Sequence, residues 1–361
     1  MKILFIDDQE ELIQTTVLDN LPPTMKTEIC PFEDAESRIF SFRPDIVVLD
    51  LRRDGSESGP NGIVSFEAIW NHRFRPIVVF SAYPEMLQES QNEHPFVVYV
   101  KKGATGYVSL LEAIQRLQSQ VQSIANTERE VDIQVSIALR DVAPIIHDQF
   151  TGQSERNEAI LRTAQRRIAA MLDETSLRKS TLRPWEQYVF PPVVSDIITG
   201  DVIKKKVASV QVAEDYAVVL SPSCDLVASE GRTPKIKSVL VGRGQNVNDG
   251  CAPLSLPQQG DKRLKKLENH VGHLHSGIFF LPEIPSKMPS ICINLKNLML
   301  IPIEELIGSE PIYERIASID SPFREEIVWF LLQTLGRPGV PDRDKAEWAK
   351  SIHFSASNES K

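Results

Sequence analysis

The chain has 361 residues, of which 42% are hydrophobic and 25% charged, and its formal net charge is −9 at pH 7. The length predicts two or three domains, and the composition is ordinary for a soluble globular protein. The acidic balance argues against a large non-specific nucleic-acid surface, though not against a small basic patch, and no apolar stretch approaches the ~18 residues of a membrane span.

Four short apolar runs in the first hundred residues share one property: each ends on a polar group of the kind that metal-assisted phosphoryl chemistry uses. They are residues 3–6 before Asp7 and Asp8, 46–49 before Asp50, 77–80 before Ser81, and 96–100 before Lys101 and Lys102. Such runs are typical of strands buried on both faces of a parallel sheet. Working groups lie beyond the carboxyl ends of such strands, so these side chains are expected to converge.

The residue types indicate the chemistry of that edge. Clustered carboxylates repel one another unless a hard cation lies between them, and Mg²⁺ suits an all-oxygen site that keeps some waters. A carboxylate held beside Mg²⁺ can attack phosphorus and become an acyl phosphate. A lysine and a hydroxyl would then stabilise the charge of the phosphoryl group.

This order of acid pair, aspartate, serine and lysine resembles the receiver domain of bacterial two-component response regulators. The resemblance covers about residues 1–125. It implies an α/β, flavodoxin-like (βα)5 fold with a doubly wound parallel sheet, Mg²⁺ as the cofactor and a histidine kinase as the partner.

The resemblance also assigns the acidic residues. Asp7 and Asp8 would bind Mg²⁺ together with Asp50 and the main-chain carbonyl of Arg52, and Asp50 would accept the phosphoryl group. The loop at 52–61 is a few residues longer than the family's usual loop before its glycine, here Gly62. The alternative is that single acids at strand ends are helix caps, as Asp8 could be.

The switch residues follow from the same resemblance. Ser81 would be the switch hydroxyl, and the lysine is either Lys101 or Lys102. We favour Lys102 because it leaves Tyr99 three residues earlier, where the family has its rotating switch ring. The next residue is Gly103 instead of the common proline.

A helical connector is expected at 126–180. The helix that begins near 109 should break after 126, and further helices are expected at 128–150, which Pro144 should kink or end, and at 157–172. The connector could form a homodimer or pack on the C-terminal domain as a hairpin. Its arginines, Arg162, Arg166 and Arg167, could touch DNA phosphates, but a solvated charged face is the more common role.

Residues 181–361 predict an atypical α+β output domain with a small antiparallel sheet or barrel. Strands are expected at 193–194, 207–212, 216–220, 238–241, 278–281 and 291–295, and helices at 303–307 and 323–335. The pattern at 200–203, followed by a strand that ends at 218–221, is faintly similar to the small SH3-like barrels of toxin ribonucleases. The Ser-x-x-Cys-Asp-Leu pattern at 221–226 resembles bacterial proteins of unassigned function.

Cys224 is the most distinctive residue of this half. It could be a nucleophilic thiol activated by a histidine, or a zinc ligand, but no tight C-x2-C spacing supports zinc. The alternative, which we favour, is that Cys224 is a buried small hydrophobic residue and Asp225 caps a turn. The possible partners are His270, His273 and His275 for the thiol, and Cys251, His270 and His273 for the metal.

The sequence therefore predicts a cytoplasmic response regulator with a receiver at 1–125, a connector at 126–180 and an output domain at 181–361. The scattered cysteines favour a reducing compartment, and the start MKILFIDD is unlike a secretory signal. Phosphoryl transfer to Asp50 would switch the output domain. Two alternatives are a receiver-gated enzyme in the C-terminal half, acting through a thiol, zinc or RNA-directed barrel, and a DNA-binding regulator.

Overall fold

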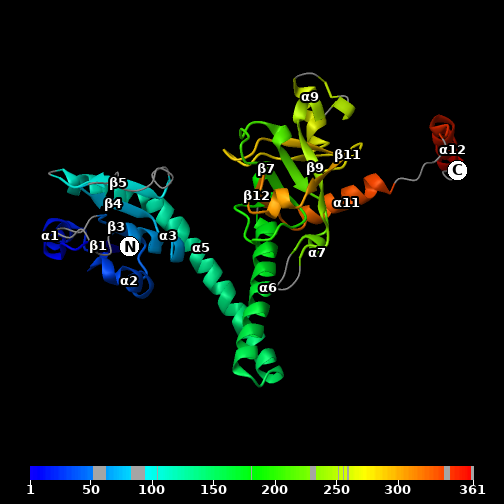
Figure 1. Ribbon diagram of the computed structural model, residues 1–361. Coiled ribbons are helices and arrows are strands. Elements are labelled where there is room, and N and C mark those ends of the chain that lie inside the picture. The colour runs from blue at the N-terminus through cyan, green and yellow to red at the C-terminus, as the bar shows by residue number, and fades with distance from the viewer. Residues whose placement is uncertain are drawn as a thin grey trace. The chain divides into compact units, whose positions relative to one another are not determined.

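The computed structural model describes residues 1–51, 62–82, 94–103, 105–179, 181–227, 233–250, 252–254, 256–257, 260–336 and 342–358. The chain divides into two compact units, Met1–Arg178 and Lys179–Lys361 (Figure 1). The loop at 52–61, the helix expected at 85–91 and Cys251 lie outside the described residues.

The first unit contains a five-stranded sheet in the order β2-β1-β3-β4-β5, and every pair in it is parallel. The strands are β1 Lys2–Ile6, β2 Lys26–Cys30, β3 Ile46–Leu49, β4 Ile77–Ser81 and β5 Val97–Lys101. This is the flavodoxin-like order, whose switch point lies between β1 and β3. The predicted fold class of this unit is confirmed.

Helices cover both faces of this sheet (Figure 1). They are α1 Glu10–Thr16, α2 Ala35–Phe42, α3 Gly62–His72 and the first part of α5 Gly106–Gln149. Alternate strand residues face opposite clusters: Val47 packs with Phe66 of α3, whereas Val48 packs with Leu110 of α5. Burial on both faces is the physical reason for the continuous apolar runs.

Helix α5 corrects the predicted connector. It runs unbroken through 44 residues, so the expected break after 126 is absent, and Pro144 lies inside it without ending it. Asn126 and Thr127 at the expected break are weak helix formers, but the strong helix formers Ala125 and Glu128 flank them. Packing of Val142 and Ile146 against Ala159 holds the turns around the proline.

Helix α6, Gln153–Lys179, returns from α5 as the second arm of a helical hairpin. Arg167 of α6 lies 2.6 Å from Asp141 of α5, and Arg162 pairs with Glu158 one turn earlier at 3.5 Å. Two of the three connector arginines are therefore engaged within the hairpin itself, as a charged helix surface usually is.

The second unit contains a seven-stranded antiparallel sheet in the order β10-β11-β9-β8-β7-β12-β6. Its strands are β6 Tyr188–Val189, β7 Asp201–Lys205, β8 Tyr216–Val219, β9 Ser238–Asn246, β10 Ile278–Leu281, β11 Ile291–Pro302 and β12 Tyr313–Ile319. Its helices are α7 Ser223–Leu226, α8 Val247–Gly250, α9 Asp261–Glu268, α10 Glu304–Ile307, α11 Phe323–Leu335 and α12 Lys345–Asn358. The predicted antiparallel α+β domain is confirmed.

Short 3₁₀ segments connect several elements of both units. They are η1 Leu18–Asn20, η2 Phe32–Asp34, η4 Pro184–Gln187, η5 Ala213–Asp215 and η6 Ala252–Leu254.

Two predicted strands of the second unit were wrong. Residues 193–194 and 207–212 form no strand, and Val207 is 99% exposed. The chain instead makes β7 one segment earlier, and β12 and β6 were not predicted. Strand β6 has only two residues, too few to show an alternation, and β12 contains Glu314, Arg315 and Ser318, which conceal it.

The two edges of the curled sheet come together at one place. Apolar residues pack on both faces, with Val202 and Val218 on the side of α11 and Ile203 and Val219 on the other. The Tyr188 hydroxyl of edge strand β6 donates to the Pro282 carbonyl, just after edge strand β10, at 2.9 Å. The sheet therefore curls toward a barrel with a seam between β6 and β10.

Candidate functional site

The predicted polar residues meet at the carboxyl edge of the parallel sheet. The Asp7 N–H donates to Cys30 O at 3.1 Å, and the Asp50 N–H donates to Ile6 O at 3.0 Å. These bonds continue the strand ladders one residue past β1 and β3, so the main chain fixes where both carboxylates begin. The Lys102 N–H likewise donates to Ser81 O at 3.0 Å.

Three carboxylates share this edge. The oxygens of Asp7, Asp8 and Asp50 all lie within 4.8 Å of one another. Asp7 and Asp50 are buried, with exposed fractions of 4% and 8%, and Asp8 is half-buried. Acids so close together and so far from water need a compensating positive charge.

Lys102 supplies one such charge. Its Nζ lies 2.7 Å from Asp7 Oδ2 and 2.6 Å from Asp50 Oδ2. The side chain of Lys101 is exposed, and its strand position pairs with Ser81. Of the two candidate lysines, Lys102 is the one that the structure brings to the carboxylates.

Main-chain donors hold the other carboxylate oxygens. Asp7 Oδ1 accepts from the Gln9 N–H at 2.9 Å, and Asp50 Oδ1 accepts from the Leu51 N–H at 2.7 Å. Burial raises the pKa of Asp7, although Lys102 opposes that shift. Burial would lower the pKa of Lys102, but attraction to Asp7 and Asp50 outweighs it and the pKa is raised. The lysine therefore stays charged through the physiological range.

The donor set fits a hard divalent cation. Three carboxylates within reach of one centre offer only oxygen ligands, which Mg²⁺ prefers. Arg52, the predicted carbonyl ligand, lies outside the described residues.

A glycine lets helix α3 approach the acceptor strand. A Cβ built on Gly62 would lie 1.8 Å from the main-chain oxygen of Asp50. The Gly62 N–H also donates to Leu51 O at 3.2 Å. Any side chain here would displace the backbone that carries Asp50, so this glycine positions the site.

The predicted switch residues lie on β4 and β5. Ser81 is fully buried at the end of β4. Tyr99 pairs with Val79 across the ladder, and its ring packs with the cluster around Phe66. Within the described residues the Tyr99 hydroxyl is buried without a hydrogen bond, and burial raises its pKa to about 12.

The C-terminal candidates do not assemble in the same way. Cys224 is exposed in α7, with its Sγ 3.8 Å from Asp225 Oδ1, and Asp225 also pairs with Lys235 at 3.3 Å. The expected buried thiol is therefore wrong. Histidine His270 stacks on His275 with ring centroids 4.1 Å apart.

The two units differ in whether they contain a cluster of potential metal ligands. In the described ranges, the acid cluster of the first unit is the one group of three or more His, Cys, Asp or Glu residues that could hold a metal ion. Cys224, His270 and His273 thus form no zinc site among themselves.

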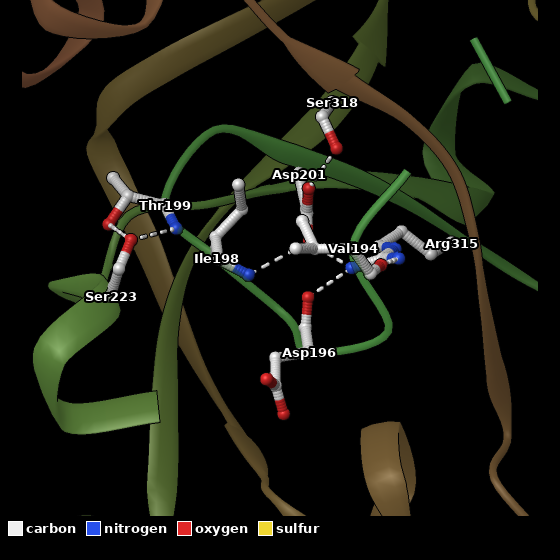
Figure 2. Close-up of polar contacts among 8 residues, drawn as sticks. All are labelled: Val194, Asp196, Ile198, Thr199, Asp201, Ser223, Arg315 and Ser318. Atoms are coloured by element: carbon white, nitrogen blue, oxygen red, sulfur yellow. Dashed lines mark hydrogen bonds and ion pairs between the residues drawn. The ribbon is translucent and has the colours of Figure 1, made fainter. Parts of the chain in front are cut away.

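The serines around Cys224 have structural partners instead. Ser223 Oγ accepts from the Thr199 N–H at 3.0 Å (Figure 2). The Thr199 hydroxyl donates to Ser221 O at 2.7 Å. Ser221 Oγ accepts from the Leu240 N–H at 2.8 Å. The Ser-x-x-Cys-Asp-Leu pattern thus ties the end of β8 to the segment before β7.

A buried charge network that sequence reasoning missed holds the same segment. Asp201 is fully buried, accepts from Ser318 Oγ at 2.6 Å and lies 3.3 Å from the guanidinium of Arg315. Arg315 also donates to the Val194 and Asp196 carbonyls (Figure 2). Burial raises the pKa of Asp201, and the Ser318 and Arg315 contacts oppose it. These partners are more than a hundred residues apart, so no local pattern indicates them.

Comparisons with known proteins extend to about a third of this chain. No protein-family model and no curated protein matches it. Among solved structures, the response regulator domain of Thermotoga maritima CheB is 14% identical, covering 34% of this chain and 96% of that chain with a TM-score of 0.27.

Two further solved structures are similar to the same extent. The N-terminal domain of a response regulator/sensory box/GGDEF protein from Carboxydothermus hydrogenoformans is 22% identical, covering 34% of this chain and 99% of that chain with a TM-score of 0.28. The BeF3-activated receiver domain of Klebsiella pneumoniae RstA is 19% identical, covering 31% and 96% with a TM-score of 0.23.

None of the helices in the described ranges combines the length and the apolar character needed to cross a bilayer.

Proposed function

We propose that the first unit is a phosphoryl-accepting receiver of a response regulator and that Asp50 is its acceptor. The observation that supports this most strongly is the Lys102 ammonium held between Asp7 and Asp50, beside a third carboxylate. A structural ion pair needs one carboxylate, whereas three acids around one ammonium suit a site that also takes a divalent cation.

The residues then have separate tasks in phosphoryl transfer. An Asp50 oxygen attacks the phosphorus of a phosphohistidine on a kinase, and the O–P bond forms as the N–P bond breaks. The freed imidazole takes up a proton from solvent. Mg²⁺, held by Asp7, Asp8 and Asp50, would neutralise charge on the phosphoryl oxygens, and Lys102 would pair with the same group.

The switch would pass from the acceptor to α5. Ser81 is at the end of β4, which pairs with the acceptor strand β3, and its hydroxyl would donate a hydrogen bond to the phosphoryl group. Tyr99 lies on β5, and α5 follows that strand directly. A change in the Tyr99 ring would therefore alter the surface from which α5 extends, which is a local charge event that biases a two-state element. Dimerisation through α5 stays a prediction.

Intact mass tests the acceptor. The full chain incubated with Mg²⁺ and acetyl phosphate should gain one phosphoryl group, and Asp50→Asn should gain none. Asp19→Asn, on the surface segment η1, is the matched control and should be modified like the parent protein. Modification of Asp50→Asn to the same extent as the parent would refute the assignment.

A further inference from the structure

A pocket of about 820 Å³ lies at the seam of the curled sheet in the second unit. One wall is the run from Phe279 to Glu283, which is edge strand β10 and its continuation. Residues of η4, before the other edge strand, and of helix α11 also line it, together with Val247 and the segment from Leu267 to His273. The volume falls in the ~300–1,000 Å³ range of small-ligand sites.

The backbone of β10 offers a hydrogen-bonding pair to this pocket. Leu295 N–H donates to Gly277 O, so in the antiparallel ladder residues 277, 279 and 281 bond to β11. Residues 278 and 280 must then direct their backbone groups away from β11. Ile278 satisfies both of its groups with His275. Phe280 is left with an N–H and a carbonyl that bond to nothing in the described part of the chain.

The walls combine aromatic rings with unpaired charges. Phe279, Phe280 and Phe330 supply apolar surface. Glu283 follows β10 and Glu326 lies on α11, and within the described residues neither carboxylate has an ion pair. Arg183, beside η4, is the one guanidinium among the lining residues. The β10 and α11 sides of the pocket are therefore apolar with an acidic rim.

We propose that this pocket binds an extended peptide segment that adds to β10 as a further strand. One residue of the peptide exchanges two backbone hydrogen bonds with Phe280, an apolar side chain packs on the apolar lining, and flanking basic side chains meet Glu283 and Glu326. Peptide addition to a sheet edge takes its affinity from main-chain bonds and its specificity from such side-chain pockets. The inference is independent of phosphoryl transfer.

The observations favour a peptide over a small apolar molecule for one reason. A paired amide N–H and carbonyl on a strand edge are complementary to another peptide unit, whereas an apolar compound would leave both groups dry and unbonded.

The test is a titration of the full chain with the capped pentapeptide acetyl-Lys-Val-Phe-Val-Lys-amide. Saturable binding is expected with one site, together with slowed hydrogen exchange at the Phe280 amide. Two N-methylated forms, one at the central Phe and one at the preceding Val, probe the strand register, because only alternate residues face β10. One form should lose binding and the other should retain it.

Matched variants test the acidic rim. Both Glu325 and Glu326 are exposed on α11, but only Glu326 lines the pocket. Glu326→Lys should weaken the peptide at least about fivefold and Glu325→Lys less than about twofold, since an exposed attraction becomes a repulsion in only the first. No binding at ~1 mM peptide, a range that admits even weak affinities, would overturn the proposal. So would equal binding of both N-methylated forms.

Discussion

The Lys102 ammonium lies 2.6 Å from the Asp50 carboxylate, although 52 residues separate the two in sequence. The contact exists because β3 and β5 end at one edge of a parallel sheet, and it joins the predicted acceptor to the group that would read its charge. It also makes the lysine a counter-ion for two buried acids, which has consequences for stability.

Replacing Lys102 should destabilise the first unit. Lys102→Met leaves Asp7 and Asp50 without their shared cation, and we expect a loss of about 2 kcal/mol, below the ~3–5 kcal/mol of fully buried pairs because the lysine is partly exposed. Urea unfolding in EDTA measures it. Lys101→Met, at an exposed neighbouring position, should stay within ~0.5 kcal/mol of the parent protein.

Magnesium should reverse much of that loss. A divalent cation between the same carboxylates takes over the role of the missing ammonium, and binding to the native state stabilises it by mass action. If millimolar Mg²⁺ stabilises Lys102→Met no more than an Asp7→Asn, Asp8→Asn double variant, the acid cluster does not hold the ion.

Magnesium binding should weaken on acidification earlier than an ordinary aspartate would cause. Because burial raises the pKa of Asp7 above 3.8, this carboxyl becomes protonated at a higher pH, and the proton competes with the metal. Calorimetric titrations near neutrality and at about pH 5 should show lower affinity at the acid value. Asp7→Asn should bind Mg²⁺ more weakly at both values and lose most of the difference; an unchanged pH dependence would exclude Asp7 as its source.

Tyr99→Phe should stabilise the first unit. The buried hydroxyl has no hydrogen bond in the described ranges, so removing it relieves a desolvation cost of about 1 kcal/mol. Thermal unfolding measures the gain, and Tyr107→Phe on α5 serves as a comparison. A clear loss of stability would mean that the hydroxyl has a partner in solution.

Local interactions leave a pattern in the sequence, whereas long-range interactions do not. The apolar runs of β1, β3, β4 and β5 predicted the parallel sheet because burial on both faces leaves a pattern that a few residues reveal. The order of their terminal residues then predicted the acid cluster. Lys102 could be preferred to Lys101 only through the family resemblance, since two adjacent lysines do not differ in residue type and nothing local shows which of them faces the carboxylates.

The side-chain contacts of the second unit were harder to predict from the sequence, for a physical reason. Asp201 follows Gly200 at the start of β7, and its carboxylate is buried because Arg315 and Ser318 approach from β12. Likewise, the sequence pattern around Ser221 and Ser223 indicated Cys224 as the candidate group. The two serine hydroxyls instead accept hydrogen bonds from backbone N–H groups about twenty residues away in sequence, those of Leu240 and Thr199. Partners at such separations are specified by topology, which local patterns do not contain.

Ser223→Ala should therefore matter more than any change at Cys224. Loss of the acceptor for the Thr199 N–H should cost about 1–2 kcal/mol in the second unit, since a partly buried donor is left unsatisfied. Cys224→Ser, at an exposed position, should stay within ~0.5 kcal/mol. Differential scanning calorimetry of the full chain resolves the two; the reverse order would restore Cys224 as the important group.

The Arg75–Glu128 contact should fix α5 to the sheet. Arg75 is buried, donates to Pro44 O at 2.8 Å and makes two bonds of 2.8 and 2.9 Å to Glu128 of α5. Glu128→Gln should cost about 1 kcal/mol, because a bond to a charged partner is weakened, and should speed hydrogen exchange in α5 near that residue. Glu130→Gln, which alters an exposed neighbour on the same helix, is the control.

The Arg75–Glu128 contact makes α5 a lever whose fulcrum is at Glu128. The helix continues for 21 residues from Glu128 to Gln149, or about 30 Å at ~1.5 Å per residue. A tilt of about 5° at the fulcrum would swing the far end by roughly 3 Å, enough to shift one row of side chains past another at a helix contact. Because α5 also extends 22 residues from Glu128 back to Gly106, the two arms are about equal in length, so a shift of the helix start beside β5 appears at the distal end at a similar size and in the opposite direction.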